Sequence, residues 1–352
     1  MKDRDCLKCL KQGTLFTQRD NLSVRIKPIP EDDRIGVPDP RVYKAEMAQK
    51  PSPQPKDDRH PTLAEIQAIR DWMGCENTDL SKGVTTERRL LDTDSGTVPV
   101  VLYSPGGSAD RPVAVYFHGG GFFGGTTRVV ENACKLLAER SGALVVSVDY
   151  ALAPEHRFPE GLMQCWQAVH WVYTHAGELG VNPDKLAVMG DSAGGNLAIG
   201  CCMLDKESII KMQILLYPCV LLNLAKADWN EAAYPMDAQY QPLLHGMVHS
   251  IGDSVPLLNA VYVDEPDKMD NPLISPLLAD SLAAMPTTMI VAAEYDYLRL
   301  QNEQFALRLS EDKVDTLLYI YKGMGHSFFE HTGEFPQAED CTNEAAEAIK
   351  SL

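Results

Sequence analysis

The sequence "GDSAGG" at residues 190–195 joins two apolar segments of the chain. Residues 186–189 before it are short and apolar and follow Pro183, which predicts a buried strand. Residues 193–204 after it are rich in Ala, Leu, Ile, Met and Cys, which predicts a buried helix. Ser192 therefore lies where a strand turns sharply into a helix, and the glycines at 190 and 194 remove side chains that would crowd this turn.

A strand, a tight G-x-S-x-G turn and a helix together form the arrangement called a nucleophile elbow. This arrangement raises a serine hydroxyl above the end of a sheet. The alternative is an ordinary glycine turn in which Ser192 has no role, because short motifs also occur by chance. The rest of the chain has to decide between these two interpretations.

Composition excludes several classes of protein. The chain has 352 residues, is 45% hydrophobic and carries a formal net charge of −17 at pH 7, which disfavours nucleic acid and anionic membranes as partners. No apolar run is long enough for a membrane helix, and the charged N-terminus does not resemble a secretory signal. We therefore expect a globular cytoplasmic protein of two domains, or of one large α/β domain with an insertion.

The chain changes character near residue 85. Residues 1–60 are polar and proline-rich, which predicts loosely ordered or wrapping chain, and Thr62 with Glu65 forms a capping box for a helix over residues 62–74. We predict an N-terminal cap or wrapping region over residues 1–84. From residue 85 onward, a hairpin around "TDSG" is followed by buried strands that alternate with helices, so residues 85–352 predict a mostly parallel sheet covered on both faces. Residues 222–274 interrupt the alternation, and we expect this insertion to contribute to the cap.

A serine nucleophile needs a base to take its proton and an acid to orient that base. Asp296 and His326 each follow a predicted strand, and the order Ser192, Asp296, His326 is the order found in α/β-hydrolases. A lone histidine is more often structural, but the strand-end position and the order favour catalysis here. Glu294 and Asp315 are the nearest rivals for the acid, and both are worse placed because they lie at or within a strand.

The sequence "FHGGGFFGG" at residues 117–125 follows the predicted strand at residues 112–117. Glycines let backbone N–H groups approach a ligand closely, so we expect Gly120 and Gly121, with Ala193 beside the nucleophile, to stabilise an oxyanion. A phosphate-binding loop is the alternative, but no lysine follows as the P-loop pattern requires. A dinucleotide loop would need an acidic residue about 20 positions later, and Asp149 comes later than that.

Six motifs in order carry a resemblance to a known family: "HGGGF", "DYALAPEHRFP", "GDSAGG", "ISPLLAD", "AEYDYLR" and "GMGHSF". Over residues 85–350 the chain resembles the hormone-sensitive-lipase family of α/β-hydrolases, in the branch of bacterial acetyl esterases and carboxylesterases. The resemblance implies an α/β-hydrolase fold with a cap from the N-terminal region plus the insertion. It also implies Ser192 as nucleophile, Asp296 as acid, His326 as base, an oxyanion hole, and no cofactor or metal.

The expected function is hydrolysis of acetyl to butyryl esters through an acyl-enzyme. One alternative is a non-catalytic receptor on the same fold, as in plant gibberellin receptors, but those have lost the catalytic histidine and His326 is present here. An acyltransferase or amidase would use the same triad. The expected partner is a small ester, with an acetylated sugar as one candidate, and a homodimer is one candidate assembly. Cys6 and Cys9 have zinc or redox spacing, but no second pair follows, so we predict no site there.

Overall fold

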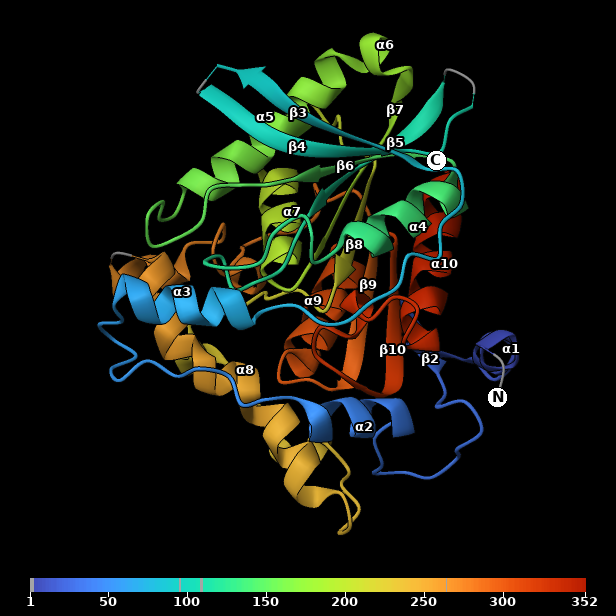
Figure 1. The fold of residues 1–352 in the computed structure, drawn as a ribbon, viewed down its shortest axis with the longest axis vertical. Helices are drawn as coiled ribbons and strands as arrows, with labels where there is room; N and C mark the ends of the chain where they lie inside the picture. Colours follow the sequence, from blue (N-terminus) through green and yellow to red (C-terminus); the bar gives the residue numbers. More distant parts are fainter. Residues whose placement is uncertain (1–2, 95, 108–109, 264) are drawn as a thin grey trace.

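The centre of the molecule is a ten-stranded sheet with helices on both faces (Figure 1). The computed structural model describes residues 3–94, 96–107, 110–263 and 265–352. The strands are β1 (Leu15–Arg19), β2 (Leu22–Lys27), β3 (Thr85–Thr93), β4 (Gly96–Ser104), β5 (Arg111–Phe117), β6 (Leu144–Val148), β7 (Val181–Asp191), β8 (Met212–Leu216), β9 (Thr287–Tyr295) and β10 (Thr316–Gly325).

The strands lie in the order β1-β2-β10-β9-β8-β7-β5-β6-β4-β3. Neighbours pair in parallel from β2 to β6, whereas β1 at one edge and β4 and β3 at the other pair antiparallel. This confirms the mostly parallel sheet predicted from the sequence. The predicted hairpin is β3–β4, although residue 95 in its turn lies outside the described residues.

Ten α-helices lie among the described residues. They are α1 (Asp3–Gln12), α2 (Pro40–Ala48), α3 (Leu63–Trp72), α4 (Glu131–Ser141), α5 (Glu160–Thr174), α6 (Ala176–Leu179), α7 (Ala193–Leu204), α8 (Gln241–Tyr262), α9 (Arg299–Glu311) and α10 (Pro336–Lys350). Short 3₁₀ turns are η1 (Leu224–Lys226), η2 (Glu231–Ala233), η3 (Pro266–Asp270), η4 (Pro276–Leu278) and η5 (Phe328–Glu330).

Each central strand contributes to two cores because successive side chains point to opposite faces of the sheet. In β5, Val113, Val115 and Phe117 belong to the core that includes buried residues of α5, α7 and α9, while Ala114 and Tyr116 belong to the core that includes α4 and α10. All five of these residues are buried. The continuous apolar strands predicted from the sequence are therefore covered on both faces, and the polar ends of the strands are left to carry the chemistry.

The N-terminal region differs from the prediction of loosely ordered chain. Strand β2 pairs in parallel with β10 and extends the sheet, and the buried Lys27 at its end forms ion pairs with Asp340 at 2.8 Å and Glu344 at 2.5 Å. These partners lie about 300 residues away in sequence, so the local pattern gave no sign of the pairing. The capping box at Thr62 is confirmed at the start of α3.

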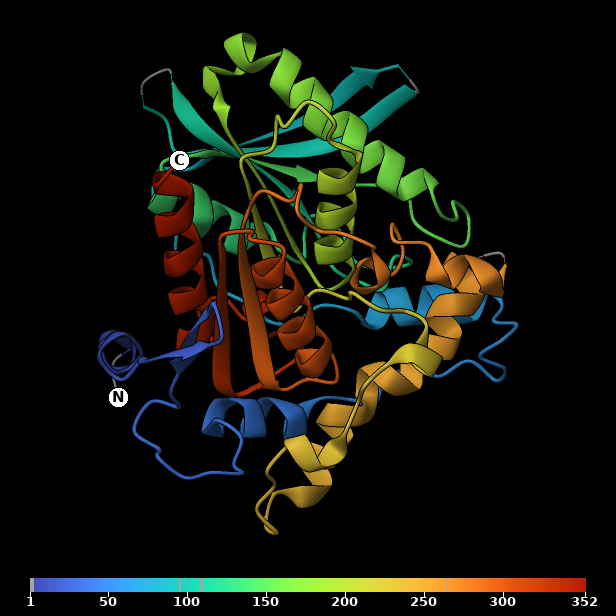
Figure 2. The same cartoon turned by 180° about the vertical axis from the view of Figure 1, so that it is seen from behind.

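The insertion contains α8, a helix of 22 residues that the sequence analysis did not predict. Figures 1 and 2 show α2, α3 and α8 lying together across one end of the sheet. Helix α8 contacts the ends of the strands, since the side chain of Met247 packs against Gly325 at the end of β10 and the ring of Tyr297, just after β9, packs against Gly252. The division into residues 1–84 and 85–352 stays a prediction. In the described part of the chain, no helix combines the length and the apolar character needed to cross a membrane.

Candidate active site

Ser192 lies between the end of β7 and the start of α7, as the strand–turn–helix prediction requires. Its backbone has φ +54° and ψ −117°, a strained conformation for a residue with a side chain. A Cβ on Gly190 would stand 2.3 Å from the carbonyl oxygen of Gly194, and a Cβ on Gly194 would stand 2.0 Å from that of Phe117. Glycine at both positions is therefore what allows the helix to begin directly against the strand.

His326 and Asp296 meet Ser192 at the same edge of the sheet. His326 follows β10, and its Nε2 lies 2.9 Å from Oγ of Ser192. Asp296 follows β9, and its Oδ2 lies 2.8 Å from Nδ1 of His326. The structure thus brings the three sequence-predicted residues into one chain of hydrogen bonds.

Burial and charge act in opposite directions on the imidazole. Burial lowers the pKa of His326, but the charge of Asp296 and its hydrogen bond outweigh this effect, so the pKa is raised above its usual value. Asp296 is 1% exposed, and its other oxygen, Oδ1, accepts a hydrogen bond from the N–H of Leu298 at 2.9 Å. The carboxylate is therefore fixed in orientation from both sides, which fixes the imidazole.

The glycine-rich loop after β5 has the backbone that glycine permits. Gly120 has φ +118° and Gly121 has φ +61°, and a Cβ on Gly120 would stand 2.2 Å from the carbonyl oxygen of Gly124. The hydrogen bonds found among the described residues use none of the N–H groups of Gly120, Gly121 and Ala193. These three N–H groups are therefore available to a ligand.

Asp191, which the sequence analysis did not single out, attaches the glycine-rich loop to the elbow. Its buried Oδ1 accepts hydrogen bonds from the hydroxyl of Tyr116 at 2.8 Å and from the N–H of Gly119 at 3.0 Å. Burial raises the pKa of Asp191 to about 6, although these two hydrogen bonds lower it. The sequence did contain a signal for this role, since Asp191 is a carboxylate at the end of an apolar strand and next to Ser192. A buried charge needs partners, so a hydrogen-bonding role for Asp191 could have been expected.

Two tyrosines that the sequence analysis did not single out contact His326 and Asp296. The ring of Tyr217, which follows β8, lies 4.9 Å from the ring of His326 between centroids. Tyr234 in the cap donates a hydrogen bond from its hydroxyl to the backbone oxygen of Asp296 at 3.0 Å. Both contacts arise from the packing of distant segments, which periodicity along the chain does not report.

The rival acids lie elsewhere. Oε2 of Glu294 accepts a hydrogen bond from the N–H of Gly323 at 2.7 Å, and Asp315 precedes β10 at the opposite end of that strand from His326. Cys201 and Cys202 in α7 are buried, as expected of small core residues.

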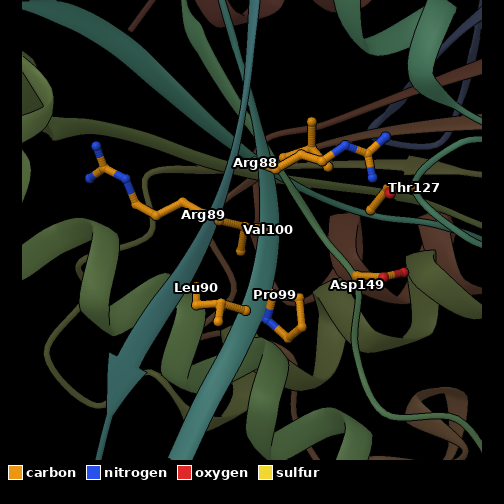
Figure 3. Close-up of a pocket in the computed structure, with 8 residues that line it drawn as sticks. Arg88, Arg89, Leu90, Pro99, Val100, Thr127 and Asp149 are labelled. Atoms are coloured by element: carbon orange, nitrogen blue, oxygen red, sulfur yellow. The ribbon is translucent and has the colours of Figure 1, made fainter.

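Two cavities lie away from the triad. The first, of about 180 Å³, lies beside β3 and β4, where Figure 3 shows Arg88 pointing toward Thr127 and Arg89 pointing to the other side of the strand. The second, of about 570 Å³, lies between the N-terminal segment and α8 and is lined by Arg59, His60 and Arg157 among others. No residue of the triad lines either cavity.

Comparison with known proteins identifies the family of the chain. A family model described as the alpha/beta hydrolase fold matches residues 114–330. This chain belongs to that family. Within the α/β-hydrolases, it lies in the hormone-sensitive-lipase branch that its motifs resemble. An arylesterase of Saccharolobus solfataricus is 34% identical over 235 residues, which cover 66% of this chain and 72% of that protein. Carboxylesterase NlhH of Mycobacterium tuberculosis is 33% identical over 272 residues, covering 75% of this chain and 82% of that protein.

Solved structures of this α/β-hydrolase family share its fold. A hyperthermophilic esterase from Pyrobaculum calidifontis has a TM-score of 0.65 and 32% identity, covering 76% of this chain and 85% of that one. The thermophilic carboxylesterase EstE1, cloned from a metagenomic library, has a TM-score of 0.67 and 30% identity, covering 79% of this chain and 90% of that one.

Proposed function

We propose that this α/β-hydrolase is a serine carboxylesterase that hydrolyses short-chain acyl esters, from acetyl to butyryl. The observation that carries the proposal is the unbroken hydrogen-bond chain from Oγ of Ser192 through His326 to Asp296. The coarser statement rests on the family and on relatives at 30–34% identity that are named esterases: the chain is a carboxylic ester hydrolase.

The proposed reaction begins at Ser192. Its Oγ attacks the ester carbonyl carbon while Nε2 of His326 takes the hydroxyl proton, and the carbonyl oxygen becomes an oxyanion. Collapse of this intermediate breaks the bond to the alcohol, which leaves with the proton from His326. Water then attacks the acyl-enzyme by the same route, so that the acid is released and the serine hydroxyl is restored.

The oxyanion is proposed to accept hydrogen bonds from the N–H groups of Gly120, Gly121 and Ala193. None of these groups has another acceptor among the described residues, and the attachment of Gly119 to Asp191 holds their loop beside the elbow. Donors fixed before the reaction need no reorganisation when charge develops, and loss of one such donor typically costs about 3 kcal/mol of barrier. Asp296 is proposed to hold the imidazole tautomer and to stabilise the imidazolium.

The preference for short acyl groups is supported by apolar side chains of α8 near the site. A methyl carbon of Leu258 lies 2.6 Å from the position that a Cβ on Gly121 would occupy, and the methyl carbon of Met247 lies 2.6 Å from the corresponding position on Gly325. The ring of Phe122, the residue after Gly121, stacks on the ring of Tyr262 at 3.9 Å between centroids. This close packing of α8 against Gly121, one of the proposed oxyanion donors, and against Gly325, which precedes His326, supports a small acyl site.

Substitution of the proposed nucleophile tests the mechanism. For Ser192→Ala we expect kcat on p-nitrophenyl acetate to fall by about 10⁶, because the variant cannot form the acyl-enzyme. The matched control is Ser254→Ala, a half-buried serine of α8 whose Oγ donates to the backbone oxygen of Ser250, and this variant should keep the wild-type rate. Activity of Ser192→Ala within about tenfold of wild type, in a variant with an unchanged circular dichroism spectrum, would reject the proposal.

The acyl preference is tested separately with wild-type enzyme and nitrophenyl esters from acetyl to decanoyl. We expect kcat/KM to be highest for acetyl or butyryl esters. An optimum at decanoyl would overturn the preference and leave the triad intact.

A further inference from the structure

Three side chains of the cap converge on its surface, and none of them belongs to the proposed triad. Glu231 lies in η2, and His245 and His249 lie one turn apart in α8, so both histidines project from the same face of that helix. One ligand atom from each side chain lies within 4.8 Å of the other two. This Glu231–His245–His249 cluster joins an otherwise irregular segment of the insertion to its long helix.

The three ligand atoms lie within 4.8 Å of one another, and an ion at their centre would replace the present hydrogen bond between Glu231 and His245. Oε1 of Glu231 lies 2.7 Å from Nδ1 of His245 and 3.7 Å from Nε2 of His249. A zinc ion bound at 2.0–2.1 Å in tetrahedral geometry holds its ligand atoms about 3.3 Å apart. The two observed distances bracket this value, so small side-chain rotations would complete the coordination.

The second histidine of the cluster has an unused nitrogen. Nε2 of His249 is shielded from solvent, and among the described residues it has no hydrogen-bond partner, since 3.7 Å is too long for a hydrogen bond. The other face of this imidazole is packed, because Trp229 lies edge-on to it at 4.9 Å and itself stacks on Tyr297 at 5.4 Å. Trp229 therefore supports the ring on one side while Nε2 lies 3.7 Å from Oε1 of Glu231, an arrangement that suits a metal ligand.

We propose that Glu231, His245 and His249 bind one zinc ion on the cap, with water in the fourth position. Two imidazole nitrogens and one carboxylate form a donor set that suits zinc and disfavours calcium or magnesium, which take oxygen ligands. The site is distinct from the proposed triad and takes no part in ester hydrolysis. The ion links η2 to α8 and so holds the cap segment that carries Trp229 and Tyr234 against the residues following β9.

Zinc binding to the full chain tests the site directly. After removal of metals with EDTA and buffer exchange, isothermal titration with zinc chloride should show one equivalent bound per chain, and zinc should raise the melting temperature. In His245→Ala and His249→Ala, we expect the affinity to fall by at least about tenfold and the thermal shift to disappear. Glu231→Gln should weaken binding in the same direction while keeping the size of the side chain.

Two controls separate this site from other zinc ligands of the chain. His156 forms an exposed pair with Glu160 at 2.6 Å and has no second histidine in the pair, so His156→Ala should bind zinc as wild type does. Cys9→Ser removes a partly exposed thiol and should also leave binding unchanged. Wild-type protein that binds no zinc, a His249→Ala variant with unchanged affinity, or loss of the equivalent in Cys9→Ser would each overturn the proposal.

Discussion

The strands that carry the triad and the cap that covers them are held in different ways. Strands β7, β9 and β10 are each paired to strands on both sides, and residues 186–191 of β7 and 288–295 of β9 are buried. The cap segment over residues 222–262 consists of short 3₁₀ turns and one helix, and many of its residues are exposed. It is attached to the sheet by side chains such as Tyr234 and Met247.

Because of this difference, we expect the strands to position the proposed reacting atoms and the cap to shape the space around them. The positions of Ser192, Asp296 and His326 follow from backbone hydrogen bonds between parallel strands, which tolerate little movement. The cap is attached through individual side-chain contacts, so one contact can be lost while the others remain. We therefore expect changes at the strand ends to affect catalysis strongly, and changes in the cap to have smaller effects.

The largest expected effect within this comparison is at the strand-end acid. Asp296→Asn keeps the size of the side chain but removes the charge and favours the wrong imidazole tautomer at His326. We expect kcat on p-nitrophenyl acetate to fall by about 10⁴. A fall of less than tenfold, measured on protein with unchanged secondary structure, would show that the acid does not orient the base.

The sheet could be predicted from sequence because its strands are apolar, short and separated by helices. The meeting of the three proposed triad residues could be predicted for a related reason: strand ends meet at one edge of a parallel sheet, so Asp296 and His326 had to approach the elbow if both strands joined it. Asp191 was missed because its role depends on which loop packs beside it.

The regions that were not predicted depend on contacts that are distant in sequence. Helix α8 contains Gly246, Gly252 and Pro256, which argue against a helix locally, yet its buried residues make the helix favourable in the fold. Strand β2 is stabilised by β10, and its terminal Lys27 is a polar residue that only the distant carboxylates make acceptable in the interior. Neither the packing of α8 nor the pairing of β2 with β10 can be read from local secondary-structure propensity.

The same substitution should have opposite effects in the two regions. In Gly194→Ala the new Cβ would meet the carbonyl oxygen of Phe117 at 2.0 Å, so we expect a loss of about 3 kcal/mol of stability and a fall in kcat/KM of about 100-fold as Ser192 shifts. In Gly246→Ala nothing lies within 4 Å of the new Cβ, and alanine favours the helix by up to about 1 kcal/mol. Denaturant unfolding and steady-state kinetics of both variants measure the contrast. Equal stability changes would contradict it.

The pH profile tests the electrostatic link between the two strand ends. In the proposed mechanism His326 must be neutral to accept the serine proton. Because its pKa is raised, kcat/KM should fall about tenfold per pH unit below a midpoint above 6.5. Asp296→Asn removes the charge that raises this pKa while burial continues to lower it, so the midpoint of the residual activity should move to lower pH. An acid limb at the same pH in both proteins would show that Asp296 does not control the imidazole.

The smallest expected effect is at the cap contact of the triad. Tyr234→Phe removes the hydrogen bond to the backbone oxygen of Asp296 but keeps the aromatic ring, over which the guanidinium of Arg299 lies at 4.2 Å. We expect the free energy of unfolding to fall by about 1 kcal/mol and kcat by less than tenfold, because 1.4 kcal/mol is needed for a factor of ten.

Tyr43→Phe is the matched control for this cap contact, since Tyr43 is exposed and its ring contacts Tyr240 by an edge that phenylalanine also has. Stability and kcat of this variant should equal those of wild type. If Tyr234→Phe instead lowers kcat as much as Asp296→Asn does, the acid is positioned by the cap rather than by β9, and the separation between the two regions does not hold. If Tyr234→Phe lowers the free energy of unfolding but leaves kcat unchanged, the hydrogen bond from Tyr234 does not align the proposed triad. A misaligned carboxylate at Asp296 would lower kcat.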